Sequence, residues 1–283
     1  SVFANFRIDT PERLDALKIS FKSFNDKRIK NWVINIRGEY KSETKKYLIQ
    51  KCKSKIKVFH FESSKGWMYD SNKIIKFLKS ELVLFWVEDH ICLKNRREYL
   101  FECAKDMKKN DVDQMLYSFW HGGDELKGLM GIIKNETKNI VFYNLNKYSL
   151  KTRDENRAKL GLEKIGFIIN AVSIFKKKIF FKIIKTRKPW KRRYNKLLPF
   201  DFEKRSEDKF WLPINLGISK KEIFASLDDD HGEKGYSLIS RKIYSKIFSR
   251  NIEVKKREGN LKQKKKNYIG KITYFIRNQF DIF

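Results

Sequence analysis

The stretch LVLFWVEDHICL, residues 82–93, decides the expected fold because it joins an apolar run directly to a cluster of charged side chains. Residues 82–87 are all apolar, which is typical of a strand buried on both faces of a parallel sheet. Glu88, Asp89 and His90 follow at once. A strand that ends in this way holds two carboxylates and an imidazole at one edge of a sheet, on a rigid support.

Strand and helix patterns alternate along the first part of the chain. The apolar segments that we interpret as strands are 2–8, 31–36, 56–61 and 82–87. The segments between them are helical in pattern, and the first of these helices begins at Thr10 and Pro11, an N-cap followed by a first-turn proline. This alternation predicts an α/β fold with a mostly parallel, Rossmann-type sheet flanked by helices.

Beyond residue 95 the pattern is less regular. We expect a helix at 97–109, a strand and a glycine-broken loop within 113–126, and an extended segment at 139–150. Residues 160–184 are expected to be helical in at least their second half. No internal repeat is present in the sequence.

The formal net charge of +30 is concentrated in two segments. Residues 176–196 contain eleven Lys or Arg and no acid, and residues 241–283 contain thirteen against three. Basic residues interleaved with apolar ones suit a helix in the interface of an anionic membrane, and they equally suit a phosphate-binding surface for nucleic acid. A solvated, lysine-rich face is the third interpretation.

The cysteine content bears on the compartment. Cys52, Cys92 and Cys103 have neither CxxC nor zinc-ligand spacing, which fits a reducing environment. No secretory leader and no apolar run of about eighteen residues is visible. We therefore expect a cytoplasmic protein.

Four segments in a fixed order carry a resemblance to a known family. They are FRIDTPERLDALKISFKSF (6–24), GWMYDSNKII (66–75), LVLFWVEDH (82–90) and SLDDDHGEKGYSLISR (226–241). The chain resembles nucleotide-sugar glycosyltransferases of the GT-A fold, of the family-2-like type that builds bacterial surface polysaccharides. The resemblance covers the first ninety residues well and the remainder only in islands. In it, Glu88 and Asp89 are adjacent where the family usually has two Asp separated by one residue, and Arg37-Gly38-Glu39 stands where the second strand usually ends in acids.

The resemblance implies a domain organisation and a function. It implies a GT-A-like domain at 1–240, with a nucleotide-binding half at 1–95 and an acceptor half at 96–240, followed by a basic, helical, membrane-associating extension at 241–283. The implied reaction transfers a sugar from a nucleotide-diphosphate sugar to a surface-glycan or lipid-linked acceptor, metal-assisted and with inversion, at the inner face of the cell membrane. The alternatives are a metal-dependent protein that binds or processes nucleic acid and, third, a basic membrane-bound scaffold.

The resemblance also implies roles for residues at the strand ends. The expected donor-binding residues are Arg7, Asp9, Arg37, Gly66, Trp67 and Glu88. Asp89 is the first choice as ligand for Mn²⁺ or Mg²⁺, which prefer oxygen, and His231 is a second ligand from the opposite wall. The acid pair is also explained by helix capping or by pairing with Arg96 or Arg97, and Trp67 by packing. Surface pairing with nearby acids is the alternative for the residues at the ends of the first two strands.

An inverting transfer needs a general base to accept the proton of the acceptor hydroxyl. The leading candidates are Asp229 and Asp230, in the acidic run that begins at Asp228. Asp124 and Glu203 compete with them for this role. A solvated acidic turn explains the run equally well.

Overall fold

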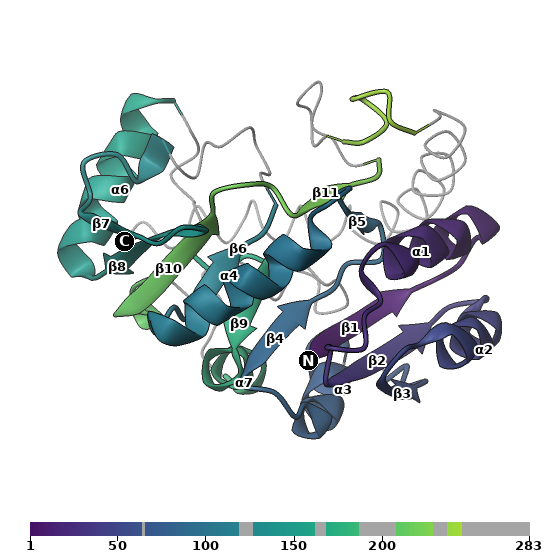
Figure 1. Ribbon diagram of the computed structural model, residues 1–283. Coiled ribbons are helices and arrows are strands. Elements are labelled where there is room, and N and C mark those ends of the chain that lie inside the picture. The colour runs from purple at the N-terminus through teal and green to yellow at the C-terminus, as the bar shows by residue number, and fades with distance from the viewer. Residues whose placement is uncertain (64–65, 119–126, 162–167, 187–207, 229–236, 245–283) are drawn as a thin grey trace, which may run out of the picture.

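A computed structural model describes residues 1–63, 66–118, 127–161, 168–186, 208–228 and 237–244 of the chain. Within this part, one sheet of nine strands extends across the molecule in the order β3-β2-β1-β4-β9-β6-β10-β8-β7 (Figure 1). Its strands are β1 Val2–Arg7, β2 Asn31–Arg37, β3 Lys55–Phe59, β4 Leu82–Phe85, β6 Gln114–Leu116, β7 Lys134–Glu136, β8 Ile140–Leu145, β9 Ser173–Lys176 and β10 Ile214–Ser219. A separate pair is formed by β5 His90–Cys92 and β11 Phe224–Ser226.

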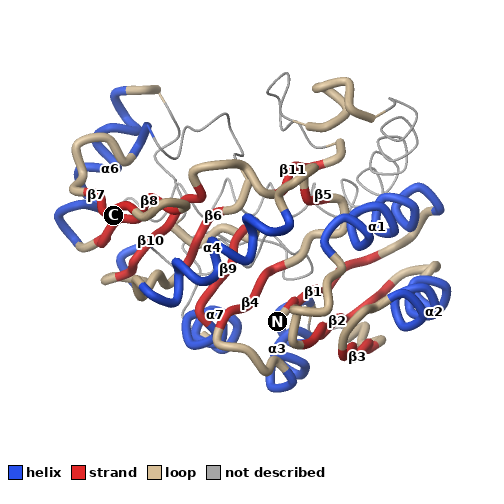
Figure 2. Tube along the Cα trace, viewed as in Figure 1, coloured by secondary structure: helices blue, strands red, loops and turns tan. Residues whose placement is uncertain are grey.

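Helices cover both faces of the large sheet, and Figure 2 shows them alternating with the strands. The helices are α1 Pro11–Phe24, α2 Lys41–Lys51, α3 Trp67–Ile74, α4 Arg97–Lys109, α6 Lys147–Lys159 and α7 Lys177–Lys185. The 3-10 turns η1 Ile75–Phe77 and η4 Asp208–Phe210 add to them. No helix in the described ranges is both long and apolar enough to span a bilayer. The predicted α/β fold with a mostly parallel sheet is confirmed by this architecture.

The first half of the sheet forms as its sequence predicts. β1 is parallel to both β2 and β4, and β2 is parallel to β3. The Thr10 hydroxyl accepts a hydrogen bond from the Arg13 amide at 3.2 Å, so the expected N-cap of α1 is present. Leu14, Leu17 and Phe21 then bury one face of that helix.

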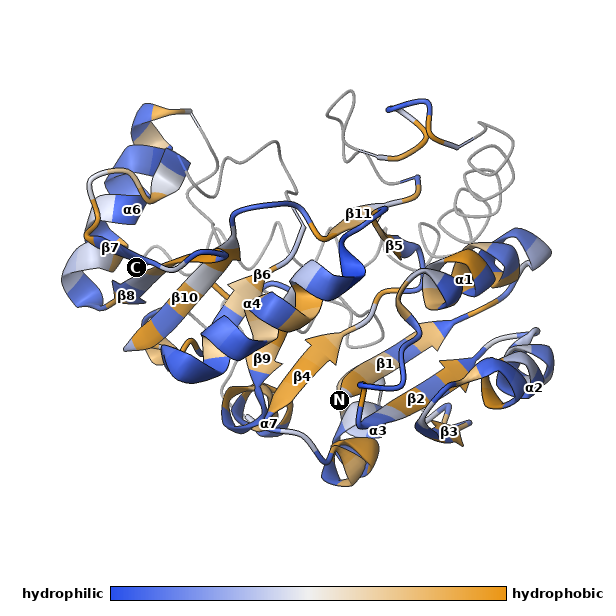
Figure 3. Cartoon of the chain, viewed as in Figure 1, coloured by the Kyte–Doolittle hydropathy of each residue, from blue (hydrophilic) through white to orange (hydrophobic). Residues whose placement is uncertain are grey.

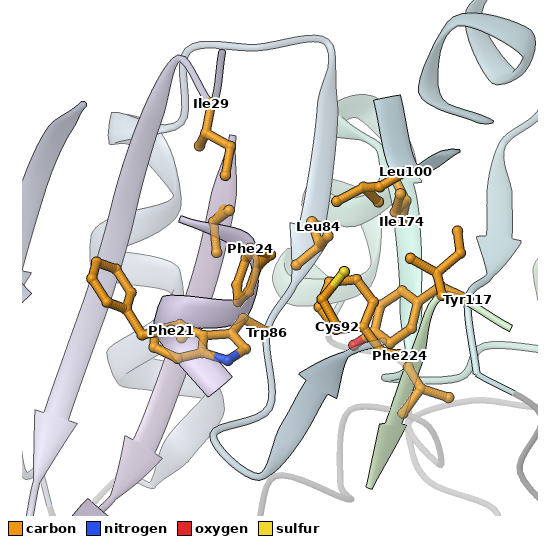
Figure 4. Packing of buried hydrophobic residues seen from close by; sticks show 14 of the residues in the cluster. Phe21, Phe24, Ile29, Leu84, Trp86, Cys92, Leu100, Tyr117, Ile174 and Phe224 are labelled. Atoms are coloured by element: carbon orange, nitrogen blue, oxygen red, sulfur yellow. The ribbon is translucent and has the colours of Figure 1, made fainter. Parts of the chain in front are cut away.

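Two hydrophobic cores lie on opposite faces of the sheet. On one face, α1 and α4 pack over a cluster of interlocked side chains shown in Figure 4, among them Phe21, Phe24 and Trp86. On the other face, α3 and α7 pack over a cluster that includes Trp67 and Phe180. Figure 3 shows that β4, between these layers, is hydrophobic along its length, as expected for a strand buried on both faces.

Two expectations about the second half are wrong. The extended segment expected at 139–150 ends at Leu145, because the Asn146 side chain and Ser149 form a capping box that starts α6. The helix expected in 160–184 is confirmed only for α7, since β9 precedes it as an antiparallel strand between β4 and β6. The first three residues of β9 are all buried, so the sequence shows no alternation of apolar and polar residues that would mark β9 as a strand.

The sheet does not stop at the boundary between the two expected halves. β1 to β4 come from residues 1–95, while β6 to β10 come from residues 96–240. The division into a nucleotide-binding and an acceptor half stays a prediction. Of the expected C-terminal extension, only residues 241–244 belong to the described part.

Candidate functional site

Six strands of the sheet end at one common edge. β1, β2, β3 and β4 are mutually parallel, and β6 and β10 are parallel to each other. β9 is antiparallel to both β4 and β6, so β4 and β6 run in the same direction. Ligands of open α/β sheets bind outside the carboxyl ends of the strands, so this edge is the candidate site.

Arg37 is the last residue of β2 and is only 8% exposed. Its guanidinium makes no ion pair or hydrogen bond in the part of the chain that the structure describes, and Nε is buried without a partner. Burial, and then the nearby positive charge of Arg7, lower the pKa of Arg37. The carboxylates of Asp70, Glu62 and Asp9 act against this lowering without cancelling it. A buried cation that makes no ion pair or hydrogen bond is costly to the folded state, so this position suits an anion from outside the chain.

Arg7, at the end of β1, has partners where Arg37 has none. Its Nε lies 2.7 Å from Asp9 Oδ2, and its Nη1 is ion-paired with Glu62. The three side chains are about half exposed, with 49%, 44% and 48% of their surfaces accessible. The structure therefore brings the predicted residues Arg7 and Asp9 together at this edge and adds Glu62, which follows β3.

A glycine allows the loops after β1 and β2 to touch. Gly38 has φ +95°, and a Cβ placed there would lie 2.5 Å from both Asp9 Oδ1 and the Ile8 carbonyl oxygen. The Tyr40 amide also donates to the Ile8 carbonyl at 3.0 Å. Only glycine combines this backbone angle with so close an approach. The contact fixes Arg37 next to the end of β1.

Buried amides hold the loop between β3 and α3 against the sheet. Asn35 Nδ2 donates to Asn5 Oδ1 at 3.0 Å and to the Phe61 carbonyl at 2.9 Å, while Asn5 Nδ2 donates to Ser71 Oγ at 2.9 Å. At the start of α3, the Ser63 amide donates to Asp70 Oδ2 at 3.1 Å. Asp70 is 1% exposed and contributes negative charge near Arg37.

Trp67 belongs to this packing. Its ring is fully buried, and its Nε1 donates to the Asn5 carbonyl. This burial agrees with the packing alternative for Trp67, and the contact between Trp67 and the nucleotide stays a prediction. Gly66, also buried, precedes α3 with φ +93° and serves the turn into that helix.

Glu88 and Asp89 follow β4 and face Arg13 of α1. Arg13 Nη1 lies 2.8 Å from Glu88 Oε1 and 3.6 Å from Asp89 Oδ2. The side chains are largely buried, with 20%, 12% and 8% exposed for Arg13, Glu88 and Asp89. The alternative pairing with Arg96 or Arg97 is not seen, because these arginines donate to the backbone carbonyls of Glu222 and Ser23.

The turn that carries Glu88 and Asp89 is held in place by α1 and by His90. Ser20 donates to the His90 carbonyl and accepts from Trp86 Nε1 at 2.8 Å, which ties the turn to α1. His90 Nδ1 lies 3.0 Å from Asp89 Oδ1. Burial raises the pKa of Glu88, and the charge of Arg13 acts against this rise without cancelling it.

The carboxylate oxygens of Glu88 and Asp89 are hard ligands of the kind that Mg²⁺ and Mn²⁺ prefer. In the structure, however, Arg13 already supplies their positive charge. No group of three or more His, Cys, Asp or Glu side chains with metal-site geometry is found among the described residues. These residues therefore do not fit a divalent cation as they stand.

The acidic run begins beside Asp89. β11 pairs with β5, which sets Ser226 opposite His90, and the Leu227 amide donates to the Asp89 carbonyl at 2.8 Å. The chain returns to the same place, because the amides of Leu238 and Ile239 donate to the carbonyls of Ser226 and Leu227 at 2.9 and 3.1 Å. Figure 1 shows β5 and β11 beyond the end of β4, close to α1. Leu227 and residues 238–239, which come before and after the segment 229–236 in the sequence, thus lie together near Asp89.

The predicted base and second metal ligand lie outside the described residues. This applies to Asp229, Asp230 and His231, and also to Asp124 and Glu203. Directly after β6, the hydroxyl of Tyr117 donates to the Phe85 carbonyl at 2.7 Å. Tyr117 therefore joins the ends of β6 and β4, a role that the sequence did not indicate.

Comparison with known proteins gives similarity at low identity. Among solved structures, TarS of S. aureus has 15% identity and a TM-score of 0.48, over 79% of this chain and 35% of that chain. TarS residues 1–349 in complex with UDP have 14% sequence identity and a TM-score of 0.40. The same residues in complex with UDP-GlcNAc have 13% identity and a TM-score of 0.40. These matches cover 79% of this chain, which spans 60% and 58% of those two chains. No family model and no curated protein matches the sequence. Scores of this size leave the functional assignment to the residues themselves.

Proposed function

We propose that the protein is a glycosyltransferase that takes a sugar from a nucleotide-diphosphate donor. The observation that carries this proposal is Arg37, a guanidinium buried at the carboxyl edge of parallel strands that makes no ion pair or hydrogen bond with the described part of the chain, so that it has no negative charge in direct contact. A diphosphate supplies such a charge, and Arg binds phosphate oxygens with two hydrogen bonds at once.

The groups around Arg37 suit the rest of a nucleotide. Asp9 and Glu62 are about half exposed, so their oxygens can accept hydrogen bonds from ribose hydroxyls while they remain bonded to Arg7. Arg7 and Arg37 together place two positive charges where the nucleotide phosphates would lie. Glu88, fixed by Arg13, is the proposed contact on the far side of β1.

In the proposed transfer, an acceptor hydroxyl oxygen attacks the anomeric carbon as the bond to the diphosphate oxygen breaks. The electron pair of that bond leaves with the nucleoside diphosphate, where positive side chains stabilise its charge. A carboxylate of the acidic run, Asp229 or Asp230, accepts the hydroxyl proton. This role is supported by the described residues on either side of 229–236, which lie near Asp89, and a single displacement of this kind inverts the anomeric centre.

Metal use is part of the proposal only in a restricted form. A divalent cation would have to displace Arg13 from Glu88 and Asp89 and would need a further ligand such as His231. When bound, such an ion would supply charge neutralisation as a Lewis acid. No step above depends on it.

The acceptor is proposed to be a growing surface glycan or its lipid-linked precursor, reached from the inner face of the cell membrane. The lysine-rich composition of the chain supports this location, because anionic lipid attracts basic surfaces. The nucleotide-sugar proposal does not depend on the identity of the acceptor.

A panel of nucleotide sugars tests the proposal. The full chain is incubated with UDP, GDP and ADP sugars, with UDP-GlcNAc included because it occurs in a TarS structure. Release of free nucleotide and the melting temperature are both measured. We expect one donor class to raise the melting temperature and to be hydrolysed slowly without acceptor. An absence of both effects with every donor, together with tight binding of single-stranded nucleic acid, would overturn the proposal.

A further inference from the structure

The helices on the sheet face opposite α1 present a lysine-rich surface. α3, η1 and α7 together contain the six lysines Lys73, Lys76, Lys177, Lys178, Lys182 and Lys185, and no arginine. Their one acid, Asp70, is 1% exposed and lies 4.0 Å from the Lys73 ammonium, so it presents no free carboxylate on the outer surface. α3 packs against α7, and both helices lie at the lower edge of Figure 1, so the lysines come from adjacent elements.

Half-buried aromatic rings lie between these lysines. The Lys73 ammonium lies 4.9 Å from the Phe61 ring centre and 4.6 Å from that of Tyr69. Lys57 of β3 and Lys76 approach Phe77 at 4.2 and 5.4 Å. Rings and ammonium groups thus alternate along α3, η1 and the edge strand β3.

The same arrangement continues along α7. Lys182 lies 4.8 Å from the Phe210 ring centre, and Lys177 and Lys185 lie 5.9 and 5.3 Å from that of Phe181. Phe180, Ile183 and Ile184 bury the inner face of α7, which leaves Phe181 half-buried among the lysines.

We propose that this surface, α3–η1–α7 with the adjoining Lys57, docks the protein onto an anionic lipid bilayer. Lysine side chains extend to lipid phosphates while their methylene groups lie along apolar surface, and half-buried aromatic rings enter the interfacial layer. None of these three elements carries an exposed acid that the headgroups would repel.

A bilayer fits this surface better than nucleic acid does. Recognition of phosphate in nucleic acids relies strongly on the planar fork of arginine, which α3, η1 and α7 lack. Lysine is a point charge without preferred orientation, which suits a fluid layer of headgroups. Docking through this face also leaves α1 and its contacts with β5, on the opposite side of the sheet, uncovered.

Vesicle binding by the full chain tests the inference. The variant K73Q/K76Q/K182Q/K185Q is compared with the control K41Q/K46Q/K51Q/K105Q, which removes four exposed lysines from α2 and α4 on the other face. Both variants lose the same net charge, so the attraction of the remaining chain, including 245–283, falls equally. Co-sedimentation with phosphatidylcholine vesicles containing phosphatidylglycerol is the measurement.

We expect the α3–α7 variant to bind anionic vesicles on the order of tenfold to a hundredfold more weakly than the control, since each lysine near such a surface adds a severalfold factor. Neutral vesicles should bind neither protein. Equal melting temperatures show that the variant is folded. Equal vesicle affinities of variant and control would overturn the inference, as would a larger loss of affinity for a single-stranded oligonucleotide than for vesicles. Donor hydrolysis plays no part in this readout, so the result is independent of the proposed function.

Discussion

The Leu227 amide donates a hydrogen bond to the Asp89 carbonyl at 2.8 Å, which joins two acidic segments that are far apart in the sequence. One segment follows the buried strand β4, and the other follows β11. Residues 238 and 239 also return to the carbonyls of Ser226 and Leu227, so the described residues on either side of 229–236 lie beside each other. The proposed active site is built from both segments.

Arg13 is expected to serve as the resident counter-charge of Glu88 and Asp89. Arg13→Met leaves two largely buried carboxylates without their cation, which should lower the free energy of unfolding by about 3 kcal/mol. Mn²⁺ should then raise the melting temperature of the variant more than that of the unmodified chain, because the ion takes the vacated position. Thermal unfolding with and without Mn²⁺ is the measurement.

Arg28→Met is the matched control for this experiment. Arg28 is 39% exposed and pairs with Asp26 and Glu98 at the surface, so its loss should cost about 1 kcal/mol or less. It should not change the response to Mn²⁺. A greater Mn²⁺ effect on the unmodified chain than on Arg13→Met would contradict the assigned role.

Glu88→Gln should change how stability depends on pH. Burial raises the pKa of Glu88 in the folded state, so the folded protein holds this proton more tightly than the unfolded chain does. That stabilisation is complete below the ordinary glutamate pKa and is lost as the pH rises through the folded-state pKa. Glutamine cannot ionise, so the free energy of unfolding of the variant does not decrease in this way as the pH rises.

The free energy of unfolding, measured by urea titration from pH 4 to pH 8, checks this prediction. The variant should become more stable than the unmodified chain as the pH rises above the ordinary glutamate range, which lies at about 4.3. A difference that is constant with pH, or that moves in the other direction, would show that Arg13 outweighs burial.

Gly38→Ala should be much more damaging than Gly131→Ala. Both glycines have positive φ, +95° and +76°, so both substitutions meet backbone strain of about 1–3 kcal/mol. A Cβ at Gly131 meets open space, whereas one at Gly38 meets Asp9 and the Ile8 carbonyl at 2.5 Å. We therefore expect Gly38→Ala to lose additional stability and to weaken donor binding, since Arg37 is the preceding residue. Similar unfolding free energies for the two variants would contradict this packing.

The first half of the fold could be predicted from the sequence because its signals are local. Thr10 and Pro11 mark the start of α1, and the apolar run at 82–87 marks an inner strand. β9 could not be predicted, because its burial arises from strands β4 and β6 on either side of it. A short apolar segment that is buried on both faces has no periodicity of its own.

The sequence indicated where the candidate site residues lie, but not the ion pairs that they form. Arg7, Asp9, Arg37, Glu88 and Asp89 all lie at or next to strand ends, as the parallel pattern indicates. Arg13 was missed, although it lies in the first turn of a helix that follows one of these strands, a signal that the sequence did contain. The full burial of Trp67 could not be predicted, because a glycine beside an aromatic residue does not show whether the sheet will bury the ring.

The binding of a donor phosphate by Arg37 is tested by isothermal titration of a nucleoside diphosphate, with UDP as the first probe. The diphosphate is titrated into the unmodified chain, into Arg37→Met and into the control Arg28→Met. Loss of a charge-assisted hydrogen bond costs about 1.5–3 kcal/mol, so Arg37→Met should bind roughly tenfold to a hundredfold more weakly. Its melting temperature should be unchanged or higher, because the removed charge is buried without a partner in the described part of the chain. If Arg37→Met binds as tightly as Arg28→Met and the unmodified chain, Arg37 does not hold a donor phosphate and the account is contradicted.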